Sequence, residues 1–294
     1  MSANEHPSAG PLNEGSQRSH LVGNLWRQEG VKGVTVALFS TVVVVGALVY
    51  AILHSRYWPD FKHAFFNADV FGESFPDILR AFRRNIVYFL VAEPVILIWA
   101  LALAVFRSLR GPVFFPLRLL ATIYVDLFRG IPTILVIYLL GFGLPSLGIT
   151  GLPRAGWFWG MVGLILSYSA YVAEVYRAGI ESVHPSQTAA ARALGLSRWH
   201  TLRFVVIPQA VRRVVPPLMN DFIALQKDTA LIAVVSGVYA EAFLMGQIYQ
   251  AGLFNFTPIL GTALCFLVIT IPMTRLTDWL LERQRRRRQA GATI

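Results

Sequence analysis

Long apolar runs separated by short polar segments dominate the pattern of this chain. An α-helix needs about 20 mostly apolar residues to cross the hydrocarbon core of a membrane. The runs that meet or nearly meet that length are residues 34–53, 86–106, 119–141, 157–173, 214–236 and 257–281. Because lipid offers no water to the backbone amides, each run is expected to be helical. The sequence therefore predicts an all-α polytopic membrane helix bundle with about six transmembrane helices.

The segments around the apolar runs complete the expected organisation. Residues 1–33 are polar and predict a disordered tail. The run 34–53 ends in His54-Ser55-Arg56 rather than in a small-residue cleavage site, which indicates a retained anchor and not a signal peptide. Residues 75–84 are expected to form a short separate helix along the outer membrane surface. Residues 282–294 form a basic tail.

The distribution of Lys and Arg predicts the orientation of the chain. With the N-terminus in the cytoplasm, the inside segments hold 17 Lys or Arg and the outside segments hold 6. Positive residues gather on the cytoplasmic side of membrane proteins, so both termini are expected to be cytoplasmic. Arg80, Arg83 and Arg84 oppose this bias, because they fall on the outside.

Composition excludes several other classes of protein. The chain is 55% hydrophobic and only 14% charged, whereas soluble domains carry about 25% charged residues. Its net charge is +10, but the basic residues lie between apolar runs, which favours a membrane over nucleic acid as the partner. The His residues and the single cysteine, Cys265, show no metal-ligand spacing. No phosphate-binding G-x-x-x-x-G-K-S/T loop is present, so the chain is not expected to be an enzyme that hydrolyses ATP.

Residues 174–213 form a polar loop with a regular pattern of helix signals. Ser186 is the expected N-cap of an Ala-rich helix over residues 187–194, and Gly195 is suited to end that helix in a left-handed conformation. Ser197 is expected to cap the next helix, which should stop at Pro208. Two interpretations stand: an amphipathic connector on the membrane surface, or an element that couples a cytoplasmic partner to the membrane helices.

Three motifs along the chain resemble those of the permease subunits of ATP-binding-cassette importers. The loop matches the spacing of the EAA motif, E-A-A-x3-G-x9-I-x-L-P. Its positions here are Ala189, Ala190, Ala191, Arg192, Gly195, Leu196, Ser197, Ile207 and Pro208. Residues 124–132 and 216–231 resemble signatures of the polar amino acid subfamily. The resemblance covers about residues 82–281, while the anchor and loop over residues 34–81 are additional.

The resemblance implies a type I importer core of five helices that works by alternating access in a bacterial inner membrane. It implies a second permease subunit (identical or different), cytoplasmic ATPase subunits that use ATP and Mg²⁺, and an external solute-binding protein. The cargo would be a polar amino acid, and this chain itself would bind no cofactor or metal. Ala189 replaces the leading Glu of the motif, so one contact with the ATPase is not expected here.

Charged residues within the apolar runs are the candidates for a substrate path or gate. Buried charge is expensive in a membrane, so such residues usually face protein or water. Asp126 and Arg129 share a helix face and are expected to pair, as are Glu174 and Arg177. A bend is expected at Pro132, just after Arg129. Each pair fits a static brace as well as a moving gate.

The fifth run is the most polar of the six. It holds Asn220, Asp221, Lys227 and Asp228. Adjacent residues on a helix point about 100° apart, so Lys227 and Asp228 are expected to have separate partners. This run is predicted to line the path, with helix packing or a dimer seam as the alternative. For the whole chain, an ion-coupled secondary carrier and a membrane enzyme stay open as other functions.

Overall fold

A computed structural model describes residues 30–109, 111–237 and 241–290, and all regular structure within them is helical. The elements in chain order are α2 (Gly30–Leu53), α3 (Trp58–Phe65), α4 (Ala68–Ser108), η1 (Pro112–Phe114), α5 (Phe115–Gly130), α6 (Thr133–Ser146), α7 (Gly156–Glu181), α8 (Pro185–Ala193), α9 (Arg198–Thr201), η2 (Leu202–Val206), α10 (Ile207–Asp228), η3 (Thr229–Ile232), α11 (Ala233–Ser236), α12 (Ala242–Leu253) and α13 (Thr257–Ala290). The predicted all-α class is confirmed. Nearly all of the predicted N-terminal tail lies outside the described residues.

The chain divides into two compact units between Lys62 and His63. In the first unit, α2 has no charged residue from Gly33 onward, and its described side chains from Thr35 onward are exposed, as expected of a helix that faces lipid. The second unit holds the rest of the described chain. The predicted start of the permease domain, residue 82, lies within α4, and this boundary stays a prediction.

The prediction of a separate surface helix over residues 75–84 is wrong. These residues belong to the 41-residue helix α4, which Asn67 caps by accepting hydrogen bonds from the amides of Asp69 and Val70. Ile78 and Phe82 are buried against Ala242 of α12 and Cys265 of α13. This packing draws the segment into the bundle. Pro76 lies inside α4 and does not end it.

The third predicted span is sharply broken. Helices α5 and α6 meet at an angle of 102° around residues 131–132. The bend expected at Pro132 is therefore confirmed, whereas a single straight crossing over residues 119–141 is not. Proline has no amide hydrogen to continue the helical ladder, and Pro132 is the residue that precedes α6.

Helix α7 lies at the centre of the second unit, where it packs against α4, α6 and α10. Its small residues allow close approach: a Cβ added to Gly163 would lie 3.2 Å from the Cα of Ile137 in α6. The buried cluster around it includes Ile96 of α4, Leu164 of α7 and Leu225 of α10. Glycine at such contacts lets helices pack closely in a membrane.

The described helices account for most of the predicted spans. By length and composition, four of them could cross a membrane, or five when α5 and α6 count as one broken span. The remaining predicted span, residues 214–236, is helical as α10, η3 and α11, but it is too polar to pass the same test.

The close approach of α7 to α11 generates a prediction. A Cβ on Gly156 would lie 2.1 Å from the carbonyl oxygen of Val235, a backbone atom that cannot move aside alone. Gly156→Ala should therefore destabilise the protein by about 1–3 kcal/mol, the usual cost of overpacking. Gly143→Ala is the control, because a Cβ there meets nothing within 4 Å. The measurement is the thermal melting of the purified protein in detergent, and equal melting of both variants would contradict this packing.

Candidate functional site

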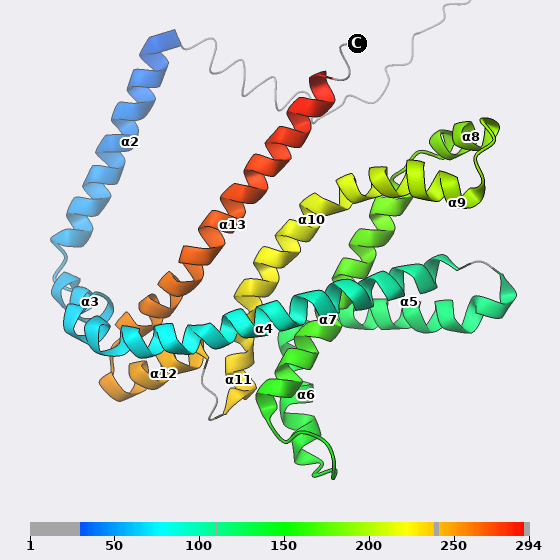
Figure 1. Ribbon diagram of the computed structural model, residues 1–294. Coiled ribbons are helices and arrows are strands. Elements are labelled where there is room, and N and C mark those ends of the chain that lie inside the picture. The colour runs from blue at the N-terminus through cyan, green and yellow to red at the C-terminus, as the bar shows by residue number, and fades with distance from the viewer. Residues whose placement is uncertain (1–29, 110, 238–240, 291–294) are drawn as a thin grey trace, which may run out of the picture. The chain divides into compact units, whose positions relative to one another are not determined.

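Residues 182–206 form a compact knob between α7 and α10, composed of α8, α9 and η2 (Figure 1). Helix α8 begins after His184, whose Nδ1 accepts a hydrogen bond from the amide of Ser186 at 3.2 Å. The predicted cap, Ser186, is instead the second residue of the helix. Pro185 occupies the first position, where its missing N–H leaves no bond unmade.

Gly195 ends α8 in the predicted left-handed conformation, with φ of +85°. The Gly195 amide donates to the carbonyl of Arg192 at 3.0 Å, and the Leu196 amide donates to that of Ala191 at 3.2 Å. These two bonds form the Schellman motif, which satisfies carbonyls that the helix end would otherwise leave open. A Cβ on Gly195 would meet nothing within 4 Å, so the backbone conformation alone selects glycine.

Ser197 caps α9 as predicted, since its hydroxyl accepts from the amide of His200 at 3.3 Å. The expectation that Pro208 stops this helix is wrong. The segment Leu202–Val206 winds as a π-helix, and α10 starts at Ile207 with Pro208 in its first turn. The wider π-turn accommodates the proline, because the Ile207 amide bonds to the carbonyl of Leu202, five residues earlier.

The knob combines a pinned interior with an exposed apolar surface. Ala191 of α8 and Thr201 of α9 are buried. Leu194 is 82% exposed, while Trp199 and Phe204 are each 61% exposed. No Asp or Glu occurs from residue 182 to residue 220, so the knob carries only basic charge. Of the predicted coupling residues, Ala189, Ala190, Arg192 and Gly195 are also exposed.

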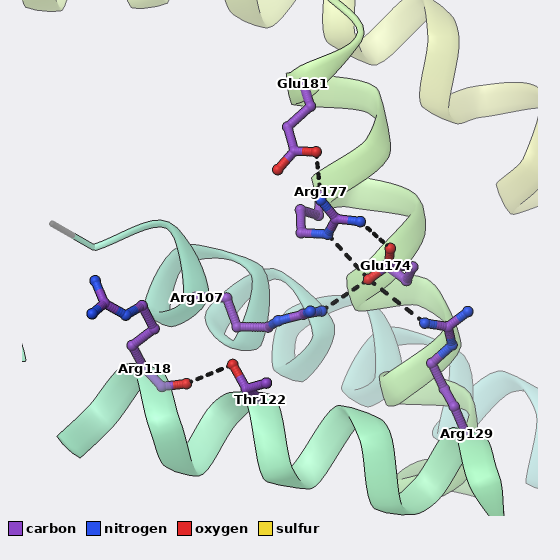
Figure 2. A network of polar contacts seen from close by, with 7 residues as sticks. All are labelled: Arg107, Arg118, Thr122, Arg129, Glu174, Arg177 and Glu181. Atoms are coloured by element: carbon purple, nitrogen blue, oxygen red, sulfur yellow. Dashed lines mark hydrogen bonds and ion pairs between the residues drawn. The ribbon is translucent and has the colours of Figure 1, made fainter. Parts of the chain in front are cut away.

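On α7, before the knob begins, one carboxylate contacts arginine side chains from three helices (Figure 2). Glu174 of α7 accepts from Arg107 of α4 at 2.9 Å, and its Oε2 lies 3.7 Å from Nη1 of Arg129 in α5. Arg177 also donates to Glu174, which confirms the predicted pair, and it bridges onward to Glu181. We call Arg107, Arg129, Glu174, Arg177 and Glu181 the α7 charge cluster.

The α7 charge cluster corrects one predicted pair. Arg129 pairs with Glu174, and the structure gives it no ion pair with Asp126, which is exposed. Sequence spacing favoured the local partner, three residues away on the same helix. The partner observed lies 45 residues later, on α7, where a partly buried carboxylate faces α5.

The knob is also tied to α10. The Arg213 guanidinium of α10 donates to the carbonyl of Ser182, the residue that follows α7. Near it, a Cβ on Gly179 would lie 2.6 Å from a methyl carbon of Val214, so α7 and α10 are in close contact. The two helices that carry the knob are therefore joined at its base.

The polar residues predicted on the fifth span lie away from the knob, along α10. Asp228 accepts a hydrogen bond from the Tyr168 hydroxyl of α7 at 2.8 Å, whereas Lys227 is exposed. The predicted divergence of these neighbours is confirmed. Asn220 is exposed, and Asp221 is half-buried and close enough to Glu93 of α4 to interact electrostatically. Asp126 and Arg129 belong to a different helix, α5.

One buried polar cluster escaped the sequence analysis. Glu241 accepts from the Asn85 amide at 2.8 Å and from the backbone amides of Phe243 and Leu244, and Asn85 also donates to Thr229 at 3.2 Å. Burial raises the pKa of Glu241, and these hydrogen bonds oppose that rise. Glu241 caps α12 and joins it to α4 and η3. The only sequence signal was an acidic residue directly before an apolar run.

The described residues contain no group of three or more His, Cys, Asp or Glu that could hold a metal ion. Charged side chains from three helices instead meet in the α7 charge cluster. The geometry suits mechanical coupling between helices.

Comparison with known proteins identifies the family. Residues 112–288, which include the knob and the α7 charge cluster apart from Arg107, match the family "Binding-protein-dependent transport system inner membrane component". This chain belongs to that family. The resemblance to importer permeases drawn from the motifs is thereby confirmed, and the ion-coupled carrier is not supported.

Individual relatives agree with the family assignment. The probable glutamine ABC transporter permease protein GlnM of Bacillus subtilis is 33% identical over 223 residues, which cover 74% of this chain and 97% of GlnM. The glutamine transport system permease protein GlnP of Escherichia coli is 35% identical over 57% of this chain and 74% of its own length. The crystal structure of an amino acid ABC transporter with histidines matches 71% of this chain and 94% of its own, with 29% identity and a TM-score of 0.63.

The α7 charge cluster of this family member generates a second prediction. Glu174→Gln removes the carboxylate with which Arg107 and Arg129 pair, so stability should fall by about 2–3 kcal/mol, short of the roughly 3–5 kcal/mol for a fully buried pair. Glu181→Gln is the matched control: Glu181 is exposed and, among the residues that the structure describes, pairs only with Arg177, which predicts a loss below about 1 kcal/mol. Thermal melting in detergent measures both, and an equal effect of the two substitutions would refute the central role of Glu174.

Proposed function

We propose that this permease moves a polar amino acid inward across a bacterial inner membrane, driven by ATPase subunits that dock on the knob. The observation that carries the proposal is the knob itself. Its shape is fixed by the Schellman turn at Gly195, it exposes Leu194, Trp199 and Phe204, and it is anchored to both α7 and α10. An exposed apolar surface on a rigid support is typical of a docking site for a protein.

The cargo and the external partner are inferred from relatives. Two of the relatives are named as glutamine permeases, and the solved structure is that of an amino acid transporter. A polar amino acid delivered by a solute-binding protein is the cargo that these names favour. A second permease subunit would complete the path, and ATP with Mg²⁺ would be bound by the ATPase subunits, because this chain has no phosphate-binding loop.

The charge of the knob predicts which groups an ATPase surface should present to it. Ala189 stands where the family motif has Glu, and Arg192, Arg198 and Arg203 supply only positive charge. An ATPase cleft that relies on a basic residue to meet the motif Glu would gain nothing here. The ATPase of this system is therefore expected to present apolar and acidic groups to the knob.

The proposed path follows the polar face of α10. Asp221, Asp228 and Tyr168 gather between α7 and α10, and Glu93 of α4 lies close to Asp221. Asn220 and Lys227 are exposed beside them and would be covered by a second subunit or by cargo. Arg129 belongs to the α7 charge cluster and is assigned to the gate, as is its neighbour Asp126.

Coupling is tested at Gly195. At φ of +85° a β-branched residue is strained by about 1–2 kcal/mol, so Gly195→Val should displace or unwind the end of α8. We expect near-normal abundance in the membrane and a loss of most ligand-stimulated ATP hydrolysis in the reconstituted complex. Gly195→Asn is the control, because Asn tolerates the left-handed conformation. Full stimulation of ATP hydrolysis with Val at this position would indicate that the loop is a passive connector.

The proposed path is tested at the end of α10. Lys227→Met and Asp228→Asn remove opposite charges with little change in shape, and at least one should lower amino acid uptake by about tenfold or more while the complex still assembles. Asp60→Asn, at an exposed carboxylate of α3, is the control. Normal uptake by both α10 variants would exclude this face from the path.

Orientation is tested by cysteine labelling. The only native cysteine, Cys265, is buried and is replaced by Ala in the background. Cysteine at Ala193, which is exposed on α8, should react with an impermeant reagent only after the membrane is opened. Cysteine at Leu147, which follows α6 and is 64% exposed, should react in intact cells. The opposite labelling pattern would invert the proposed topology.

A further inference from the structure

A groove of about 490 Å³ lies between α4 and α7, close to the point where α7 begins. Its walls are formed by Val87, Tyr88 and Val91 of α4 and by Trp157 and Met161 of α7. The Tyr88 and Trp157 rings stack with their centroids 5.9 Å apart. Val87 is 51% exposed and Val91 is 46% exposed, so the groove is open along α4. The volume falls in the range of about 300–1,000 Å³ that is usual for ligand sites.

Two arginines border this apolar groove at one end. Arg83 and Arg84 belong to its lining and are exposed, one helical turn before Val87 and Tyr88. Arg83 forms no ion pair with any residue that the structure describes. By contrast, Arg80 lies outside the groove and is paired with Asp77 at 2.7 Å. The lining contains no carboxylate.

We propose that this groove binds an anionic phospholipid, with the headgroup phosphate on Arg83 and Arg84 and one acyl chain along Val87, Val91 and Met161. Guanidinium groups bind phosphate oxygens with charge-assisted hydrogen bonds. Trp157 fits this placement, because tryptophan is enriched where membrane and water meet. The same site accounts for the arginines that oppose the Lys and Arg bias: on the outer side, they would meet lipid phosphate.

Other occupants fit the groove less well. An amino acid would find no carboxylate to pair with its ammonium group among the lining residues. A symmetric seam with a second copy, centred on the groove, would bring the positive charges of Arg83 from both copies close together. A soluble binding protein could reach the arginines but would leave the apolar walls uncovered.

The test is native mass spectrometry of the assembled permease and ATPase complex, titrated with phosphatidylglycerol and, for comparison, with neutral phosphatidylcholine. We expect preferential binding of phosphatidylglycerol. Arg83→Gln should weaken it about fivefold, the effect of one basic residue near an anionic lipid surface. Arg83→Lys should restore most of the binding. Val91→Trp fills the groove without changing charge and should also reduce it, while Arg80→Gln should not.

Several results would overturn the proposal. Unchanged phosphatidylglycerol binding in both Arg83→Gln and Val91→Trp would show that the lipid does not occupy the groove. An equal loss in Arg80→Gln would indicate only a general basic surface. Loss of binding-protein docking in Arg83→Gln with lipid binding intact, or efficient cross-linking of two copies through cysteine at Val87, would assign the groove to a protein. Lipid binding is measured without transport, so its outcome is independent of the proposed cargo.

Discussion

Glu174 is the carboxylate to which three helices of the second unit are tied. Arg107 of α4, Arg129 of α5 and Arg177 of α7 itself all form ion pairs with this side chain. A partly buried carboxylate among three guanidinium groups is favourable only while the helices stay in register, because removing one partner leaves uncompensated charge. This requirement sets the positions of α4 and α5 relative to the end of α7, from which the knob projects.

The knob is held rigidly because it is attached to this junction. It follows α7 directly, and Arg213 fastens the start of α10 to the same end of α7. Gly195 and Ser197 then fix the turns inside the knob through local hydrogen bonds. In our proposal a force applied at Leu194 or Trp199 by an ATPase would be transmitted to α4, α5 and α7 together. The sharp bend between α5 and α6, just beyond Arg129, is the natural place for that motion to be absorbed.

Some local signals were predicted correctly from the sequence, whereas the long-range pairing of Arg129 was not. Gly195 was found because a left-handed turn has few alternatives to glycine, and Ser197 because a capping hydroxyl acts on the next turn. The Arg129 to Glu174 pair was missed, since spacing can propose only partners on the same helix. The prediction of a surface helix over residues 75–84 was wrong for a related reason. Its arginines indicated exposure, while the burial of Ile78 and Phe82 against α12 and α13 depends on tertiary contacts.

The continuity of η2 into α10 shows a second limit. Pro208 would normally end an α-helix, because proline has no amide hydrogen for the helical ladder. The π-turn before it lets the helix continue, and no signal in the sequence predicts that turn. The polar face of α10 was recognised from composition alone. Its specific contact, Asp228 with Tyr168, required the structure because the two residues lie 60 positions apart.

The central claim is that the α7 charge cluster transmits movement between the knob and the membrane helices. Ligand-stimulated ATP hydrolysis by the reconstituted complex carrying Glu174→Gln, measured well below its melting temperature, tests that claim most directly. We predict that the ATPase subunits still bind and hydrolyse ATP at the basal rate, while stimulation by the loaded binding protein is largely lost. Full stimulation in the assembled Glu174→Gln complex would contradict the claim.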